Sequence, residues 1–204
     1  MFLILFATAL TLYGNLVDPP FAFMRKKKEV GFEVDLAREI AAKLNLELQF
    51  AKEGDLKVGG NESRCPYMMA PLSVLVDIKK HPEITSFKDV KGRIGIQGIG
   101  RDVAENLGEV IDYPKERTID AIVDLMEGRI DAFLKIKPAA LYLSFSSVSV
   151  KIIDDVPDLT YPIGFEVNQP DLEEKLIKAQ AELVQEGIFE TIYHKWFGIN
   201  EVMR

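Results

Sequence analysis

The strongest constraint on the fold is a regular alternation of strand and helix patterns in the second half of the sequence. Residues 93–97, 111–113 and 132–136 have the composition of short strands, while apolar residues recur at helical spacing over 101–107 and 119–130. Strand, helix, strand, helix, strand is the order from which parallel sheets are built. The sequence therefore predicts an α/β fold.

The same change between the helical and the strand spacing of apolar residues occurs at both ends of the chain. Apolar residues at helical spacing over 33–44 precede an alternating strand at 46–50. Near the C-terminus, a strand at 163–167 precedes two amphipathic helices, the first of which ends at Gly187. These patterns predict a second α/β unit built from both ends of the chain.

The first of these units is expected to be abridged. Residues 51–65 are polar and glycine-containing, and they are followed by an apolar strand pattern at 67–77. Fifteen residues are too few for an average helix of about 11 residues together with a strand and their loops. We predict that this segment is mostly loop.

Charge and composition exclude several classes of function. The net charge is −7, and the only basic run, Arg25–Lys28, falls between two strand patterns, where a solvated hairpin tip is expected. Nucleic acid is therefore not expected as a partner. The single cysteine, Cys65, and two distant histidines predict neither a disulfide nor a metal site. Gly98 and Gly100 lack the third glycine of a dinucleotide motif, so no cofactor is predicted.

The N-terminal residues are almost wholly apolar. Residues 1–10 are not part of an apolar span of 18 residues, so a membrane-spanning helix is not expected. They are interpreted as a signal remnant that continues into the first strand, with an apolar first strand as the alternative. A periplasmic or otherwise extracytoplasmic location is predicted.

Six stretches, taken in order, resemble a known family. They are residues 16–23, 30–37, 66–69, 91–97, 127–132 and 187–198. In this order they are similar to the amino-acid-type periplasmic solute-binding proteins of ABC importers, solute-binding protein family 3. The resemblance implies the type II periplasmic-binding-protein fold, with two lobes joined by crossing strands at 72–76 and 163–167 and a ligand in the cleft between them. Lobe 1 would comprise residues 11–77 and 163–204, and lobe 2 residues 78–162.

The resemblance also implies which residues bind the ligand. They lie at strand ends and helix starts, where backbone N–H groups and helix dipoles favour a carboxylate. The predicted ligand-binding residues are Asn15, Asp18, Phe21, Gly60, Arg64, Gly98, Gly100 and Arg101.

The chain matches the ligand-binding pattern of the family only in part. Asp18 stands where the family has an aromatic residue. Arg64 either is the arginine that pairs with a ligand carboxylate or belongs to the segment before Pro66. In residues 99–102 the usual hydroxyl is absent, and the acid for a ligand ammonium aligns with Ile136 or Lys137. A buried ammonium would then need another acid, such as Asp18.

The resemblance predicts a monomeric binding protein for an amino acid or small carboxylate, serving ABC import or sensing. Its partners would be the ligand and the membrane subunits of an importer. Two alternatives remain at this point. One is a degenerate scaffold or partner-binding domain, and the other is a dehydratase-like enzyme using Asp18 or Glu62. No nucleophile motif is present, and no catalytic residue is predicted.

Overall fold

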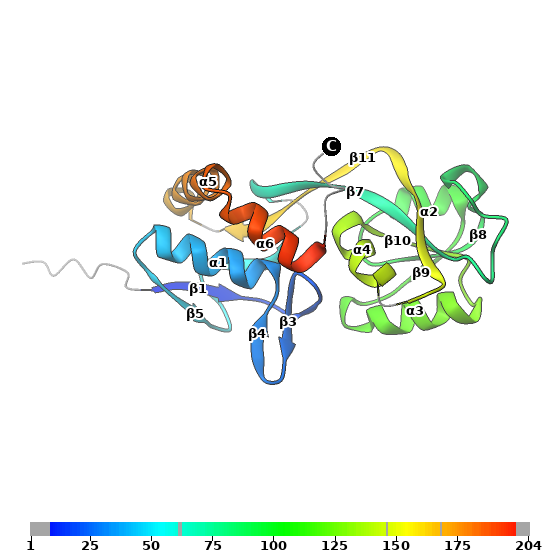
Figure 1. Cartoon of the computed structure of the whole chain (residues 1–204), viewed down its shortest axis with the longest axis horizontal. Coiled ribbons are helices and arrows are strands. Elements are labelled where there is room, and N and C mark those ends of the chain that lie inside the picture. The colour runs from blue at the N-terminus through cyan, green and yellow to red at the C-terminus, as the bar shows by residue number, and fades with distance from the viewer. Residues whose placement is uncertain (1–8, 61–62, 146, 168, 199–204) are drawn as a thin grey trace, which may run out of the picture. The chain divides into compact units, whose positions relative to one another are not determined.

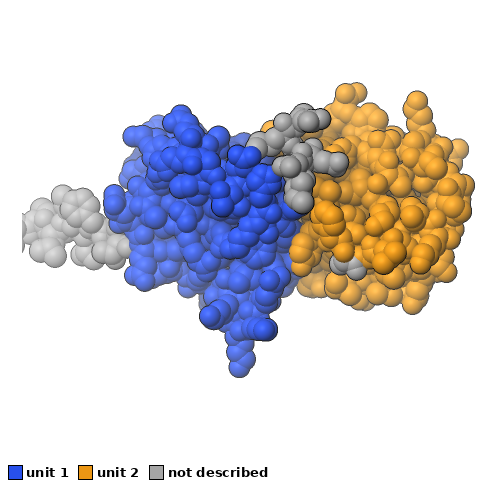
Figure 2. Space-filling view, viewed as in Figure 1, with its two compact units in different colours: residues 1–68, 162–204 blue, residues 69–161 orange. Residues whose placement is uncertain are grey.

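The chain forms two compact units (Figures 1 and 2). The computed structural model describes residues 9–60, 63–145, 147–167 and 169–198. Unit 1 comprises residues 1–68 and 162–204, and unit 2 comprises residues 69–161. Sequence analysis placed these two boundaries after residues 77 and 162. The predicted signal remnant at 1–10 lies outside the described residues except for Ala9 and Leu10, which are part of the first strand.

Seventeen strands and α-helices are found in the described residues. In chain order they are β1 (Ala9–Tyr13), β2 (Val17–Asp18), β3 (Ala22–Arg25), β4 (Lys28–Val30), α1 (Phe32–Lys43), β5 (Glu47–Phe50), β6 (Leu56–Gly60), β7 (Cys65–Asp77), β8 (Gly92–Ile96), α2 (Arg101–Leu107), β9 (Gly108–Asp112), α3 (Thr118–Glu127), β10 (Ala132–Ile136), α4 (Lys137–Phe145), β11 (Val150–Val167), α5 (Pro170–Gln185) and α6 (Ile188–Phe197).

The order of strands and helices confirms the α/β prediction, with three corrections. The segment predicted as mostly loop contains strand β6, which was missed because it is short and ends in two glycines. Helix α4 follows β10 directly and was not predicted. Strand β11 runs over 18 residues, whereas only its last five were predicted. Strands β7 and β11 each continue from one unit into the other.

In unit 1, strand β1 lies parallel to both β5 and β6, and β11 pairs antiparallel with β6. Helix α1 packs on β1 and β5, while α5 and α6 pack on α1 (Figure 1). Along β1 the buried side chains alternate with partly exposed ones, which is the pattern of a strand with one covered face. Leu10 and Leu12 form the buried face.

The connection from β5 to β6 is unusually short for two parallel strands. Parallel strands are normally joined by a crossover of a dozen or more residues, but only residues 51–55 lie between β5 and β6. The strand register explains how five residues suffice. Leu12 of β1 is in register both with Phe50, the last residue of β5, and with Leu56, the first residue of β6. The chain therefore crosses sideways by about two strand spacings, roughly 10 Å, without returning along the sheet.

The crossover is fixed on β1 by close contacts. The Thr11 backbone N–H and hydroxyl donate to the Asp55 carboxylate at 2.9 and 2.6 Å, and the Asp55 N–H donates to the Thr11 hydroxyl at 2.9 Å. A Cβ at Gly54 would lie 2.2 Å from the Thr11 hydroxyl oxygen, so the backbone passes directly over Thr11. The neighbouring side chains on this face are polar, and Lys57 pairs with Glu166 at 2.7 Å. The face opposite Leu10 is thus adapted to partial exposure.

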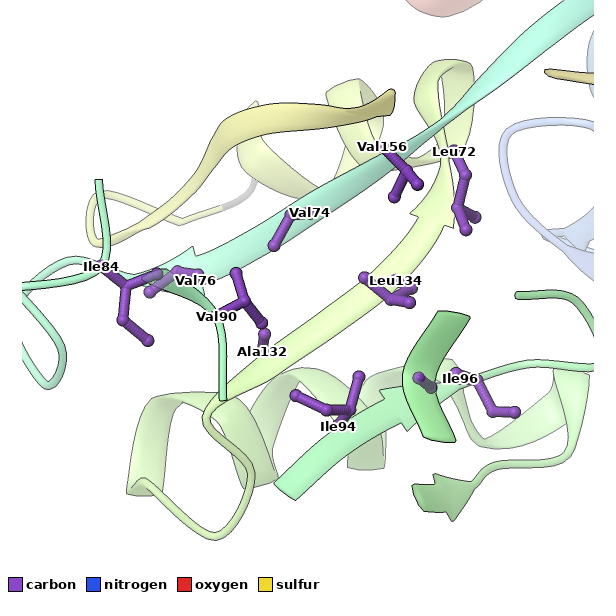
Figure 3. Packing of buried hydrophobic residues seen from close by; sticks show 11 residues of the cluster. Leu72, Val74, Val76, Ile84, Val90, Ile94, Ile96, Ala132, Leu134 and Val156 are labelled. Carbon is purple, nitrogen blue, oxygen red and sulfur yellow. The ribbon is translucent and has the colours of Figure 1, made fainter. Parts of the chain in front are cut away.

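In unit 2, β10 lies parallel to β8 and antiparallel to β7, while β9 lies parallel to β8. Both faces of this sheet are buried. Figure 3 shows one core cluster, in which Leu72, Val74 and Leu134 from neighbouring strands pack with residues of β8 and β11. Leu75 and Phe133 point to the other face and pack against α3 and α4 residues. Near-continuous burial is expected for a parallel sheet covered on both sides.

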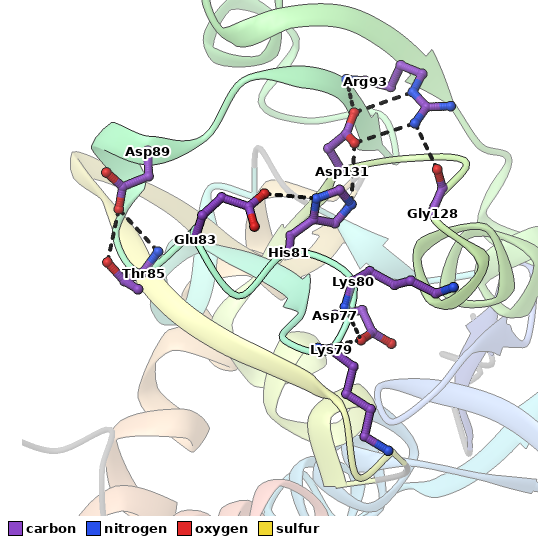
Figure 4. Close-up of polar contacts among 10 residues, drawn as sticks. All are labelled: Asp77, Lys79, Lys80, His81, Glu83, Thr85, Asp89, Arg93, Gly128 and Asp131. Carbon is purple, nitrogen blue, oxygen red and sulfur yellow. Dashed lines mark hydrogen bonds and ion pairs between the residues drawn. The ribbon is translucent and has the colours of Figure 1, made fainter.

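Hydrogen bonds fix the turn that follows β7 (Figure 4). The Asp77 carboxylate accepts from the backbone N–H groups of Lys79 and Lys80 at 2.9 and 3.2 Å and from the Ser149 hydroxyl at 2.7 Å. Burial raises the pKa of Asp77, but these donors outweigh it, so that the pKa lies below its ordinary value. Asp77 therefore stabilises unit 2 in its ionised form.

We expect the substitution Asp77→Asn to destabilise unit 2 in a pH-dependent way. Because the folded-state pKa is lowered, the stabilisation is present above the unfolded pKa of about 4 and is lost as the pH falls through the folded-state value. At pH 7 the loss should be about 1–2 kcal/mol, and it should be smaller near pH 2 than at pH 7. Urea titrations followed by circular dichroism measure both values. Asp158→Asn, at an exposed site, is the control, and an equal loss at both pH values would contradict the assignment.

Candidate functional site

In unit 2, three helices begin at one edge of the sheet. The parallel strands β8, β9 and β10 are followed by α2, α3 and α4, so their carboxyl ends and the helix N-termini meet there. This edge is the usual ligand-binding position of an open α/β sheet, and helix N-termini favour anions. Gly98, Gly100 and Arg101 of the predicted site all lie here, between β8 and the first turn of α2.

A buried lysine at this edge was missed by the sequence analysis. Lys135 is only 5% exposed, and its ammonium donates to the side-chain oxygen of Gln97 at 2.6 Å. The same oxygen accepts from the Thr118 hydroxyl at 3.1 Å, while the Gln97 amide nitrogen donates to the Pro114 carbonyl at 2.7 Å. The amide is therefore fixed with its oxygen toward the ammonium. The signal available in the sequence was a lysine within the otherwise apolar strand pattern at residues 132–136.

The edge carries further cationic groups, together with the carboxylates of Asp112 and Asp155 that pair with them. Ile136, at the position aligned with the missing acid, is buried. Lys137 pairs with Asp155 at 2.8 Å. Arg101 is exposed and pairs with Asp112 at 2.6 Å. Beside them, Gln97 and Gly98 line a shallow pocket of about 380 Å³. The edge presents positive groups and backbone donors, which suits the anionic end of a ligand.

Gly98 and Gly100 have similar backbone angles but differ in the space available for a side chain. Both have positive φ values, 74° and 77°, which favour glycine. A Cβ at Gly100 would lie 2.7 Å from a methyl group of Leu72, whereas Gly98 faces open space. Gly100 therefore holds the start of α2 against the sheet, and Gly98 leaves its backbone accessible.

In unit 1, the predicted residues differ in exposure and in the elements that carry them. Asn15 is exposed after β1, Asp18 is partly exposed in β2, and Gly60 ends β6 against the Gly164 carbonyl. The backbone N–H of Phe21 donates to the Asp18 carbonyl at 2.9 Å. The Phe21 ring is 3% exposed and packs on Phe197 with ring centroids 5.3 Å apart.

Arg64 is exposed at the start of β7, beside a small pocket of about 140 Å³ lined by residues 63–65 and 165–167. No ion pair of Arg64 is found among the described residues. Whether it grips a ligand carboxylate remains a prediction. The neighbouring Glu62, proposed above as a catalytic acid, lies outside the described residues.

A buried carboxylate connects three elements of unit 1. Glu33 is 1% exposed, and its oxygens accept from the Gly59 N–H at 2.9 and 3.1 Å and from the Tyr67 hydroxyl at 2.9 Å. Helix α1 has no side-chain cap hydrogen bond at its N-cap residue, Gly31. Burial and the Glu33 carboxylate, with a smaller contribution from Asp18, raise the pKa of Tyr67 well above its ordinary value. Glu33 thus ties the end of β6 to α1 and β7.

The arrangement of strands and helices, with its sites at the strand edges, is the type II periplasmic-binding-protein fold. An ancestral amino-acid-binding protein, a precursor of cyclohexadienyl dehydratase, superposes with a TM-score of 0.78 at 22% identity over 93% of this chain and 96% of its own. An ancestral arginine-binding protein bound to glutamine superposes with a TM-score of 0.74 at 27% identity, covering 95% and 100% of the two chains.

Sequence comparison leads to one family. Residues 12–56 match the model of the bacterial extracellular solute-binding proteins, family 3. A probable ABC transporter arginine-binding protein, ArtJ of Chlamydia trachomatis, is 29% identical over 91% of this chain and 84% of its own length. The resemblance found in the sequence is confirmed: the chain is a relative of the family 3 solute-binding proteins and has their fold. These relatives are binding proteins, so the comparisons favour binding over the dehydratase-like alternative.

No metal centre is indicated by the arrangement of side chains. Within the described ranges, no group of three or more His, Cys, Asp or Glu residues is placed to hold a metal ion. In the same ranges, no helix is both long and apolar enough to cross a membrane.

Proposed function

We propose that the chain is an extracytoplasmic binding protein for a small solute that carries a carboxylate, with amino acids as the first class to test. The observation that carries the proposal is the edge of unit 2, where Lys135 and the N-termini of α3 and α4 present positive charge. The similarity to ArtJ, a probable arginine-binding protein, and the glutamine bound to the ancestral protein support amino acids as ligands.

Unit 1 has a negatively charged group of its own among the predicted ligand-binding residues. Asp18 is partly exposed at the end of β2, and Glu33 lies buried nearby, close enough for both carboxylates to affect Tyr67. An ammonium or guanidinium group of the ligand is complementary to Asp18. In this proposal Asn15, Gly60, Gly98, Gly100 and Arg101 supply further polar contacts, and Phe21 supports the site from the core.

The proposal extends to partners and location. A solute-binding protein of this family hands its ligand to the membrane subunits of an ABC importer, and we propose the same for this chain, acting as a monomer outside the cytoplasm. The family description and the transporter names of its relatives support this.

A thermal-shift screen over amino acids and small organic acids tests the function. A ligand at 100 times its dissociation constant stabilises the folded protein by about 2.7 kcal/mol. We expect at least one amino acid or carboxylate to raise the melting temperature. If none of a broad panel does so, the chain is not a binding protein for this class, and the scaffold alternative gains weight.

For a ligand found in that screen, we expect Lys135→Met to weaken binding about 100-fold, since a charge-assisted hydrogen bond contributes roughly 1.5–3 kcal/mol. The unliganded protein should be as stable as wild type or more so, because a buried ammonium is costly to desolvate. Isothermal titration calorimetry measures the affinity. Lys151→Met, on an exposed position of β11, is the matched control. Unchanged affinity in Lys135→Met would place the carboxylate elsewhere.

A further inference from the structure

The hairpin of β3 and β4 carries an unusual turn. Arg25 pairs with Lys28 across the two strands, which leaves Lys26 and Lys27 as the two turn residues. Their φ values are 50° and 63°, in the left-handed region. Two-residue hairpin turns with two positive φ values strongly prefer Asn-Gly, because other side chains adopt this conformation at a cost. Two lysines occupy these positions in spite of that cost.

The tip concentrates unpaired positive charge. All four side chains of Arg25–Lys28 are exposed. Among the described residues, none of the four forms an ion pair, although the whole chain has a net charge of −7. Four adjacent cations repel one another, so the arrangement is unfavourable for the isolated protein. Its sign is also opposite to that of the protein as a whole.

The base of the hairpin is braced against α6. Phe23 packs edge-on against Trp196, with ring centroids 5.8 Å apart. The Arg25 guanidinium lies over both rings, at 5.2 and 6.0 Å from their centroids. The indole N–H of Trp196 donates to Asp35 at 2.7 Å. These contacts hold the hairpin in one orientation, in which it extends away from the helices of unit 1 (Figures 1 and 2).

We propose that the tip of this hairpin, Arg25–Lys28, binds the anionic phosphate groups of a phospholipid surface. Charge complementarity supports this partner, because a cluster of at least four Lys or Arg residues attracts anionic lipid headgroups. Met24, 48% exposed beside the cluster, is an apolar group able to enter the headgroup region. A single projecting tip can contact a flat surface, because this contact does not require a partner of complementary shape. The inference is independent of the proposed function, since it involves none of the ligand-binding residues named there.

Co-sedimentation of the full chain with vesicles tests the proposal. Vesicles of phosphatidylcholine with phosphatidylglycerol should bind the protein at low salt, and vesicles of phosphatidylcholine alone should not. The double variant Lys26→Asn/Lys27→Gly should lower the partition coefficient about 25-fold, since each cation near the surface contributes about fivefold. Raising the salt to about 1 M should abolish binding by screening.

Three controls make the result specific. Asn-Gly is the preferred sequence for this turn, so the double variant should melt at or above the wild-type temperature. Lys26→Arg/Lys27→Arg keeps the charge and should retain binding. Lys175→Gln/Lys178→Gln removes two charges from exposed positions of α5 and should leave binding unchanged.

The proposal is overturned if anionic vesicles do not bind the wild type, if neutral vesicles bind it equally, or if the double variant binds like the wild type. The first of these outcomes would point to an acidic protein surface instead. If no ligand stabilises the protein but anionic vesicles still bind it, only the proposed function is contradicted.

Discussion

The substitution Glu33→Ala is expected to destabilise unit 1 by about 2–4 kcal/mol. The carboxylate is buried and accepts from the Gly59 N–H and the Tyr67 hydroxyl. Its removal leaves both donors without this acceptor in a place that water reaches poorly, and such buried groups are costly. The end of β6 should also lose its tie to α1, so binding of any ligand that contacts Gly60 should weaken.

The single tryptophan of the chain, Trp196, lies in unit 1 and reports the unfolding of that unit separately. Urea titrations of Trp196 fluorescence therefore measure the effect of Glu33→Ala. Glu33→Gln keeps an oxygen for the Gly59 N–H and should lose only about 1 kcal/mol. Equal losses in the two variants would mean that packing, and not the acceptor oxygens, accounts for the effect of Glu33.

The substitution Phe32→Ala should cost about 3–5 kcal/mol in the same measurement. Phe32 is fully buried, and its ring packs on Phe197 and Tyr67 with centroids 4.9 and 5.2 Å apart. Phe189 and Tyr193 also contact it, at 5.6 and 6.2 Å. Truncation removes contacts with residues from α6 and β7 at once and leaves a cavity.

Phe32→Leu and Phe50→Ala are the controls for this prediction. Leucine retains much of the volume, and the loss should stay below about 1.5 kcal/mol. Phe50 is 37% exposed on β5, so its truncation should cost much less than that of Phe32. If Phe32→Ala were no more harmful than Phe50→Ala, the aromatic cluster around Phe32 would not be the core of unit 1.

The elements predicted correctly from the sequence are those in which apolar residues recur along the whole element at the spacing of a helix or a strand. Helices α1, α3 and α5 and the strands β5, β8 and β10 carry such patterns, and their physical cause is local. Strand β6 has only five residues, two of them glycine, and its pairing with β1 and β11 decides its conformation. Helix α4 begins at Lys137–Pro138, where a proline in the first turn was an overlooked start signal.

The candidate site was predictable in one part only. Gly98, Gly100 and Arg101 were located because a strand followed by glycines and a helix marks a strand edge. Lys135 and Glu33 were not found, because charged residues on strands and helix starts are usually solvated. Their burial depends on residues distant in sequence, such as Gln97 for Lys135 and Gly59 and Tyr67 for Glu33.

The short crossover between β5 and β6 has a consequence for engineering. Its five residues lie on the polar face of β1, and the strands they join already end and begin at the same level of the sheet. Additional residues placed between Phe50 and Asp55 would therefore extend outward without changing the strand register. Residues 51–55 are thus a natural position at which to graft a reporter helix or a second domain onto this protein.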